Sequence, residues 1–357
     1  MKYRVLAINP GSTSTKIAVF DDHEAVFIKT LRHDPQELDR FGGIIGQYEF
    51  RKGLVLEAMQ ENEISLESLE AVIGRGGLVR SVPGGTIKVN DKMLSDLKDP
   101  TNWGRIHASN LGAFIANSIA VDLDIPAYIV DPITVDEFHE VARISGVPEI
   151  ERKSLFHALN IRYTARKLAK QLGKSIEECN LVAVHLGGGI SIAAIENGKV
   201  IDVNNALLGM GPFSPQRAGS LPIGDLLDLA YSGEYTKKEL QAKLSKNSGY
   251  MGYLGTDSDI EVEKKVNEGD KKFTLIYNAL IYQLAKEIGG YATALKGKID
   301  AIFLTGGLAY NPNTEKLIKD YCSYIAPIYV FPGENEMEAL SQGGIRVLKG
   351  EEEAMEY

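Results

Sequence analysis

One supersecondary plan occurs twice in this chain, and this duplication is the strongest constraint on the fold. Residues 7–20, AINPGSTSTKIAVF, show the pattern of a short apolar strand, a turn of small and hydroxylated residues, and a second strand. Residues 181–202, LVAVHLGGGISIAAIENGKVID, repeat this order and continue through a polar turn into a third strand. Since 357 residues also exceed the usual size of a single core, we expect two domains built on one unit.

Elsewhere, runs rich in Val, Ile and Leu alternate with longer stretches of helical period, which is typical of an α/β protein. In the longest stretch, 274–297, apolar side chains recur at steps of four from Leu280 to Ala292, so one stripe is expected to face a core. A strand at 301–307 ends on two glycines and leads into another helix. Further helices are expected within residues 107–123 and 154–173.

Charge and cysteine content limit the partners and the compartment. The formal net charge of -9 disfavours nucleic acid and anionic membranes as main partners, because both need a basic surface. The chain starts directly in a strand, and no apolar run approaches the ~20 residues of a membrane span, so we expect a cytoplasmic protein. Cys179 and Cys322 make no zinc or disulfide framework, which fits a reducing compartment and predicts structural roles.

Three turns at strand ends together indicate a phosphate site. The turn NPGSTSTK (9–16) offers hydroxyls and a lysine, whereas LGGGIS (186–191) lets the backbone approach a ligand closely. The third turn follows the strand at 301–307. Each could be an ordinary solvated turn, but all three favour a phosphate chain and a nucleoside held between two domains. The P-loop, the Rossmann glycine motif and the zinc motif H-E-x-x-H are absent from the sequence.

These turns resemble segments of the acetate and butyrate kinase family. NPGSTSTK is similar to the first phosphate segment of that family, HLGGGIS (185–191) to the second, and FLTGGLAYN (303–311) to the adenosine segment. The segments that most resemble the butyrate branch are GRGGLV (74–79), DPITVDEFHEVARISG (131–146) and PFSPQRAGSLPIGDL (212–226). The matching segments follow the family's order and span nearly the whole chain.

The resemblance implies the fold of the superfamily that includes acetate and sugar kinases, heat-shock ATPases and actin. That fold has two ribonuclease H-like domains of βββαβαβα type, with the active site in the cleft between them. Residues 1–150 and 338–357 would form an acyl- and phosphate-binding domain, to which the last helix returns. Residues 151–337 would form the nucleotide-binding domain. A homo-oligomer of two or more chains is also implied.

The implied activity is the reversible phosphorylation of butyrate, or of a related short or branched fatty acid, to its acyl phosphate. ATP would be the phosphate donor, and Mg²⁺ would be required. Two alternatives stay open. An acetate or propionate kinase would differ in the acyl pocket, and an actin-like ATPase switch would phosphorylate no acceptor.

The chemistry of such a transfer favours arginine. A carboxylate acceptor is already ionised at neutral pH and needs no general base, so cations should dominate the site. The planar fork of arginine binds two oxygens at once and keeps its charge. Arg75 and Arg217 could each be a solvated loop residue, but the resemblance makes both catalytic. It also implies that Asp131 positions the arginine and the acceptor, and that His157 hydrogen-bonds the transferring phosphoryl group.

The resemblance implies the binding residues as well. The phosphates would be bound by Asn9, Ser12, Ser14, Lys16, His185, Gly187, Gly188 and Gly189. The nucleoside would lie against Asp259, Gly306 and Gly307. Magnesium would be bound by Asn9 and Glu336, with Glu338 as a competing ligand. His107 and His185 are second choices for the role of His157. In DSDIEVE (257–263) the arginine that flanks adenine in acetate kinases is missing, so base specificity stays open.

The acyl pocket is expected to admit a chain longer than acetate. Gly77 stands where acetate kinases have a valine that closes the pocket, while the other walls, Ile106, Phe156 and Leu208, stay apolar. Each additional buried methylene contributes about 0.8 kcal/mol, so the space released would favour butyrate. The alternative is that Gly77 serves only the tight turn and that a neighbouring side chain fills the gap.

Overall fold

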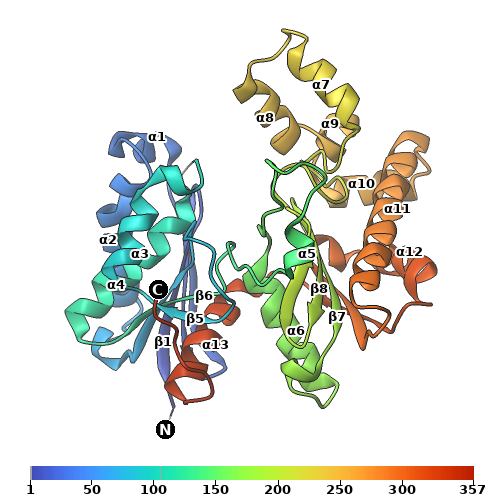
Figure 1. Ribbon diagram of the computed structural model, residues 1–357. Coiled ribbons are helices and arrows are strands. Elements are labelled where there is room, and N and C mark those ends of the chain that lie inside the picture. Colours follow the sequence, from blue (N-terminus) through green and yellow to red (C-terminus); the bar gives the residue numbers. More distant parts are fainter. Residues whose placement is uncertain (1, 105) are drawn as a thin grey trace. The chain divides into compact units, whose positions relative to one another are not determined.

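A computed structural model describes residues 2–104 and 106–357 of the chain and divides it into two compact units (Figure 1). Unit 1 comprises the chain up to Val135 together with Asn335–Tyr357, and unit 2 comprises Asp136–Glu334. The sequence led us to expect the first boundary near residue 150 and the return near residue 338. The structure places 136–150 in unit 2, where Glu137 Oε2 lies 2.8 Å from Arg162 Nη1 and accepts a hydrogen bond from the Val200 amide.

The described part of unit 1 contains a six-stranded mixed sheet with the order β3-β2-β1-β4-β6-β5. Its first three strands form an antiparallel meander, and β1, β4 and β6 run parallel to one another. β5 pairs with β6 in the antiparallel direction and closes the edge. The strands are β1 (Arg4–Pro10), β2 (Ser14–Asp21), β3 (Glu24–Arg32), β4 (Ala71–Arg75), β5 (Thr86–Lys88) and β6 (Ala127–Val130).

Helices cover both faces of this sheet. Because side chains alternate along a strand, Leu6 and Ile8 of β1 face α2 and α4, where they join a buried apolar cluster. The other face is covered by α13, which packs on β1, β4 and β6 (Figure 1). A Cβ on Gly344 of α13 would lie 2.7 Å from Ile73 Cδ1, so glycine permits this close packing. The helices are α1 (Pro35–Leu38), α2 (Tyr48–Glu61), α3 (Asp91–Lys98), α4 (Leu111–Leu123) and α13 (Glu336–Leu348), with 3₁₀ turns at Asp39–Phe41, Ile45–Gln47, Leu66–Ser68, Pro100–Asn102 and Ala108–Asn110.

Unit 2 repeats this arrangement of strands. Its described sheet has the order β11-β10-β7-β8-β9, again with an antiparallel meander followed by parallel strands. A register shift falls at Val19/Phe20 between β2 and β3, and at Ala194/Ile195 between β8 and β9. The duplication predicted from the sequence is therefore confirmed down to the irregularities of pairing. The strands are β7 (Leu181–Leu186), β8 (Ile190–Glu196), β9 (Lys199–Val203), β10 (Ala301–Gly306) and β11 (Ile328–Pro332).

The longest helix of unit 2, α11, carries the apolar stripe predicted from the sequence. Leu280, Leu284 and Ile288 are at most 1% exposed and belong to one cluster with Val184 and Leu304 of the sheet. The opposite face of the sheet is covered by α6, which packs on β7 and β10. The helices are α5 (Glu140–Arg143), α6 (Ala158–Gln171), α7 (Ile223–Tyr231), α8 (Lys237–Lys246), α9 (Gly249–Leu254), α10 (Asp259–Asn267), α11 (Lys271–Ala294) and α12 (Pro312–Cys322), with 3₁₀ turns at Ile176–Glu178 and Gly307–Tyr310.

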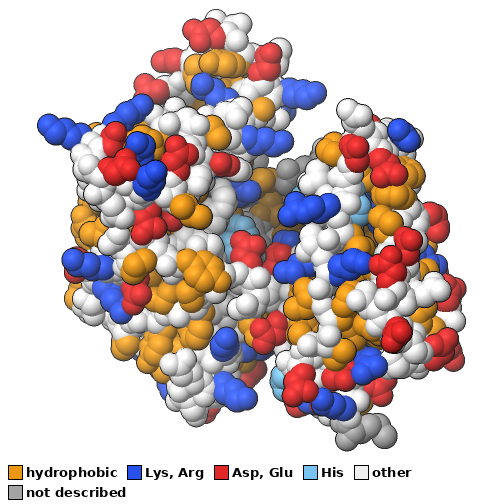
Figure 2. Space-filling model, turned by 180° about the vertical axis from the view of Figure 1, so that it is seen from behind, with side chains coloured by type: hydrophobic (Ala, Val, Ile, Leu, Met, Phe, Trp, Pro, Cys, Tyr) orange, Lys and Arg blue, Asp and Glu red, His pale blue; other side chains and the backbone are white. Residues whose placement is uncertain are grey.

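The structure shows how charged side chains are distributed over one face of the molecule and where the two cysteines lie. Acidic and basic side chains are interspersed over the face shown in Figure 2. Cys179 and Cys322 are free thiols in buried positions, and burial raises the pKa of the Cys322 thiol to about 11. Across residues 2–104 and 106–357, the helices lack the combination of length and apolar character that a membrane span requires.

The contact between β4 and α4 generates a prediction, because two glycines, Gly74 of β4 and Gly112 of α4, face each other there. A Cβ on Gly112 would lie 2.8 Å from the Arg75 amide nitrogen, too close for any side chain. We expect Gly112→Ala to lower the free energy of unfolding by about 1–3 kcal/mol through overpacking. Gly53→Ala is the matched control, since Gly53 is exposed on α2 with open space around its Cβ position.

Urea titration of both variants measures the effect. Gly53→Ala should stabilise unit 1 by up to about 1 kcal/mol, because alanine has the higher helix propensity. Equal unfolding free energies for the two variants would contradict the close packing at Gly112.

Candidate functional site

The polar cluster of unit 1 lies where β1 and β4 end. Asn9 follows the core of β1, Arg75 ends β4, and Glu336 begins α13. Arg75 Nη1 lies 2.8 Å from Glu336 Oε1 and donates to Asn9 Oδ1 at 3.1 Å, while Asn9 Nδ2 donates to Glu336 Oε2 at 2.5 Å. The helix N-terminus favours the carboxylate of Glu336 electrostatically. The structure thus brings three predicted site residues into mutual contact.

Asp131 is buried directly after β6 and contacts the loop at Gly85. The carboxylate accepts a hydrogen bond from the Gly85 amide at 2.7 Å, and its backbone adopts a φ of 39°. Within the described residues, the polar partners of Arg75 are Asn9 and Glu336 and do not include Asp131. The role expected of Asp131, to position the arginine and the acceptor, stays a prediction. In this structure Asp131 fixes the loop at Gly85, and its neighbour Pro132 packs against Gly76.

The first predicted phosphate turn has two distinct sides. Asn9 and Lys16 pair directly across β1 and β2, so their side chains lie on the same face of the sheet. Ser14, two residues before Lys16, shares that face, whereas Thr15 lies on the opposite one. Ser12 and Lys16 are exposed, and Thr15 is buried. The candidate phosphate ligands of this turn therefore gather on the side away from Thr15.

Sequence reasoning missed the residue on the opposite side of the turn. Arg51 of α2 is fully buried, and its guanidinium donates to carbonyl oxygens of the turn. One signal was available: Arg51 occupies the position of the apolar stripe that continues through Val55, Ala58 and Met59 of the same helix. A charged side chain within the buried stripe of a helix is rare and needs buried partners.

A second cluster lies in unit 2 at the end of β7, the beginning of β8 and the start of α6. The rings of His157 and His185 stack with centroids 3.9 Å apart and an interplanar angle of 13°. His157 Nδ1 lies 2.8 Å from the hydroxyl of buried Ser191, and His185 Nδ1 donates to Asn160 Oδ1 at 2.9 Å. Both rings are therefore fixed in orientation by hydrogen bonds. His107, in unit 1, instead accepts from the Ser109 amide and caps the 3₁₀ turn Ala108–Asn110.

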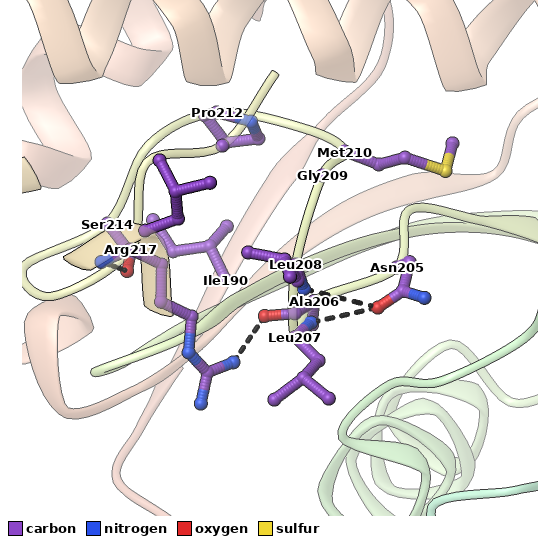
Figure 3. Close-up of a pocket in the computed structure, with 12 residues that line it drawn as sticks. Ile190, Asn205, Ala206, Leu207, Leu208, Gly209, Met210, Pro212, Ser214 and Arg217 are labelled. Atoms are coloured by element: carbon purple, nitrogen blue, oxygen red, sulfur yellow. Dashed lines mark hydrogen bonds between the residues drawn. The ribbon is translucent and has the colours of Figure 1, made fainter. Parts of the chain in front are cut away.

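The glycine turn of unit 2 lies against Arg217. A Cβ on Gly189 would lie 2.6 Å from Arg217 Cζ, so this glycine admits the guanidinium. Ser214 links the same segments, because its hydroxyl donates to the Gly188 carbonyl at 2.6 Å and accepts from the Arg217 amide. Figure 3 shows the Arg217 side chain directed at the carbonyl oxygen of Ala206, to which it donates a hydrogen bond. Gly189 thus serves the approach of an arginine.

The predicted nucleoside segment joins the same edge of the sheet. Gly306 ends β10 beside Leu186 of β7, with a φ of 91° and no room for a side chain. Its amide donates to the Gly333 carbonyl at 3.1 Å. Asp259 begins α10, where burial, together with the charge of Glu263, raises the pKa of its carboxyl to about 6. The side-chain amide of Asn311, which directly follows the Gly307–Tyr310 turn, opposes that rise.

The four expected acyl-pocket residues are distributed over both units. Gly77 is buried, but the space beside it is filled: a Cβ there would lie 2.6 Å from Asn110 Cα and 2.8 Å from the Asn110 amide nitrogen. The argument that the missing side chain of Gly77 leaves room for a longer acid is therefore wrong. Ile106 is partly buried, Phe156 is 3% exposed, and Leu208 is 37% exposed beside Ile190 and Arg217 (Figure 3).

The cluster of unit 1 would offer Mg²⁺ a single carboxylate ligand. Among residues 2–104 and 106–357, no group of three or more His, Cys, Asp or Glu side chains is arranged to hold a metal. Glu336, rather than its competitor Glu338, contacts Asn9 and Arg75. A cation held by one carboxylate, waters and phosphate oxygens matches the preference of Mg²⁺ for few protein ligands.

Known proteins are similar to this chain over its whole length. It is 52% identical over 355 residues to the protein named "Butyrate kinase 1" from Clostridium acetobutylicum, covering 99% of each chain. It is 49% identical over 357 residues to "Butyrate kinase 2" of the same organism, covering 100% of both. The model of the acetokinase family matches residues 113–347. The chain belongs to the acetokinase family.

Solved structures support the same relationship at the level of the fold. The acetate kinase of Porphyromonas gingivalis superimposes with a TM-score of 0.79 at 19% identity, covering 97% of this chain and all of the other. The expected superfamily fold and family membership are therefore confirmed. The roles expected of individual site residues stay predictions.

The buried histidine beside the phosphate turn generates a pH prediction. His33 Nε2 lies 2.9 Å from Thr15 Oγ1, and burial, followed by the charge of Arg51, lowers the pKa of His33 from 6.5 to about 4. The unfolded chain therefore binds more protons than the folded chain between pH 4 and 6.5, so stability falls as the pH falls through this range. At pH 5 the loss from this group is about 2 kcal/mol.

Urea titrations at pH 7 and pH 5 test this. His33→Gln should lose about 2 kcal/mol less than the wild type on acidification. His23→Gln, at an exposed position of the same unit, should lose as much as the wild type. If His33→Gln and wild type lose the same unfolding free energy, His33 does not titrate as described.

Proposed function

We propose that this chain is a cytoplasmic, ATP-dependent carboxylate kinase that reversibly phosphorylates butyrate, or a related short fatty acid, to its acyl phosphate. The observation that carries the proposal is the near 50% identity, over the full length of both chains, to two proteins named butyrate kinases. The basic and glycine-rich positions described above, which match the phosphate-binding chemistry of such a kinase, support it. The ligands would be ATP and a short-chain fatty acid.

Arg75 is suited to bind a phosphoryl group or a carboxylate. Within the described residues, the polar contacts of its guanidinium are made through Nη1, with Asn9 and Glu336. These contacts fix the orientation of the group through one of its three nitrogens. Its Nε and Nη2 groups donate to no residue within the described ranges, and these N–H groups can meet two oxygens of a ligand in the usual bidentate manner. We assign Arg75 to the stabilisation of charge on the transferring phosphoryl group and the acceptor.

Arg217 and His157 would act on the same phosphoryl group. Arg217 is anchored against Gly189 and by the Ala206 carbonyl, so its charge is fixed next to the glycine turn. His157 is oriented by Ser191 and by stacking on His185. No residue is needed as a general base, since the acid is ionised before it attacks the γ-phosphorus. The attack forms the acyl phosphate and releases ADP.

The remaining assignments follow the chemistry of the groups. Asn9, Ser12, Ser14, Lys16 and Gly187 to Gly189 would bind the phosphates, and Asp259, Gly306 and Gly307 would bind the nucleoside. Glu336 and Asn9 offer the hard oxygen donors that Mg²⁺ prefers, and bound Mg²⁺ would neutralise charge on the phosphate oxygens. The residues present fit this ion, because one carboxylate with phosphate oxygens and waters suffices.

We further propose that the chain forms a homo-oligomer. Ile223, Leu227 and Tyr231 recur every four residues on α7 and are 74%, 52% and 86% exposed, respectively. An apolar stripe of this kind supports self-association. Light scattering in solution measures the oligomeric state, and a monomer at micromolar concentration would contradict the proposal.

The proposed roles of the arginines generate one prediction. Removing a guanidinium that stabilises charge developing in the transition state lowers kcat far more than it weakens ATP binding. We expect Arg75→Ala and Arg217→Ala each to reduce kcat by roughly 10² or more. Arg80→Ala is the matched control, because Arg80 is exposed and pairs with Asp96. A near-normal kcat in either test variant would remove that arginine from the mechanism.

The identity of the acceptor is tested by a panel of acids. Acyl phosphate formation from acetate, propionate, butyrate, isobutyrate and valerate can be followed by trapping with hydroxylamine. Because the chain is about 50% identical to two proteins named butyrate kinases, we expect butyrate to be preferred over acetate, and burying two more methylenes at about 0.8 kcal/mol each would give about a tenfold higher kcat/KM. A maximum at acetate would favour an acetate kinase. ADP formation that no acid accelerates would favour an ATPase switch.

A further inference from the structure

Arg51 is a buried cation that has no acidic partner among the residues the structure describes. Its side chain is fully buried, yet no carboxylate within the described residues forms an ion pair with it. Burial lowers the pKa of its guanidinium to about 10, so the group stays charged at neutral pH. The nearby His33 has a pKa of about 4 and is neutral there. Burying a charge without a counter-ion is costly, so the position calls for a functional reason.

The guanidinium is instead satisfied by neutral oxygens, most of them from one turn. Nη1 and Nη2 donate to backbone carbonyls of the turn, and Nε and Nη2 also donate to the side chain of Gln47. All donor–acceptor distances lie between 2.8 and 3.2 Å. The acceptors are the carbonyl oxygens of Gly11, Ser12 and Ser14, together with Thr15 Oγ1 and Gln47 Oε1.

These bonds determine which way the peptide groups of the turn face. The Thr13 carbonyl is also engaged, since it accepts from the His33 amide at 2.9 Å. The carbonyl and the N–H of a trans peptide point in opposite directions. With the Gly11 and Ser12 carbonyls directed at Arg51, the N–H groups of Ser12 and Thr13 point away from it. Within residues 2–104 and 106–357 these two N–H groups donate to no acceptor.

The free donors lie on the side of the turn that carries the candidate phosphate ligands. Thr15 contacts Arg51, and its neighbours Ser14 and Lys16 therefore face the other side, with Asn9. Consecutive outward N–H groups in a turn make an anion-binding concavity. Arg51 thus lies behind the turn, separated by the backbone from any anion bound in front of it.

We propose that Arg51 is a positioning residue that holds this turn in its polyphosphate-binding form. The bound phosphates would lie on the opposite side of the turn backbone, where their negative charge balances the positive charge of Arg51. This rests on the proposed function in so far as the polyphosphate is ATP. Arg51 touches neither the nucleotide nor the reacting atoms. Its effect should therefore grow with the number of phosphates and be absent for a nucleoside.

The test compares Arg51→Met and Arg51→Lys with Lys52→Met. Lys52 is the neighbouring residue on α2, where it pairs with Asp122, and its replacement controls for the loss of a positive charge on that helix. Calorimetry measures the Kd of each protein for adenosine, AMP, ADP, ATP and inorganic tripolyphosphate. Circular dichroism confirms that each variant is folded.

For Arg51→Met we expect ATP and tripolyphosphate to bind about 10- to 100-fold more weakly, with a smaller loss for AMP and an unchanged Kd for adenosine. Arg51→Lys keeps a charge but cannot reach all these acceptors, so it should lose affinity for ATP to an intermediate extent. It is also the variant to use if Arg51→Met fails to fold. Lys52→Met should bind every ligand as the wild type does.

Equal losses for adenosine and ATP would mean that Arg51 is merely structural and would overturn the proposal. Wild-type affinity for ATP in Arg51→Lys and Arg51→Met would overturn it as well. The proposed function fails separately, if wild-type protein binds tripolyphosphate but forms no acyl phosphate. In that case a loss of tripolyphosphate binding in Arg51→Met still supports the role of Arg51.

Discussion

Parallel pairing between the first and fourth strands of each unit is the constraint on which both polar clusters depend. Ile8 pairs with Gly74 in unit 1, so the residues that follow them, Asn9 and Arg75, must end side by side. In unit 2, His185 pairs with Thr305, which brings the glycine turn next to Gly306. Because the carboxyl ends of parallel strands share one edge of a sheet, segments far apart in the chain meet there.

The two units use arginine at their turns in opposite ways. In the first, Arg51 lies behind a hydroxylated turn and holds its carbonyl oxygens. In the second, the turn consists of bare glycines, and Arg217 lies against the backbone of Gly189. The turn of unit 1 carries hydroxyl side chains that can donate to a ligand, whereas the glycines of the turn in unit 2 leave room for the guanidinium of Arg217. The same strand plan thus supports two different electrostatic arrangements.

The sequence predicted the features that depend on local pattern and failed for those that depend on neighbours in space. The duplicated strands and the stripe of α11 follow from periodicity, and the resemblance located Asn9, Arg75 and Glu336, which the structure places in contact. Which acid pairs with Arg75 was not predictable, since it depends on where a helix from the far end of the chain packs. Likewise, a glycine pattern cannot reveal that Asn110 fills the space at Gly77.

The place of Glu336 in the chain has a consequence for biosynthesis. Strands β1 to β6 leave the ribosome first, but α13 follows only after all of unit 2, residues 136–334, has been translated. At 5–20 residues per second this interval lasts roughly 10–40 s. During it the nascent sheet has one face uncovered, and Arg75 lacks its carboxylate. An interrupted message that ends before α13 would therefore yield a chain that cannot complete its first domain.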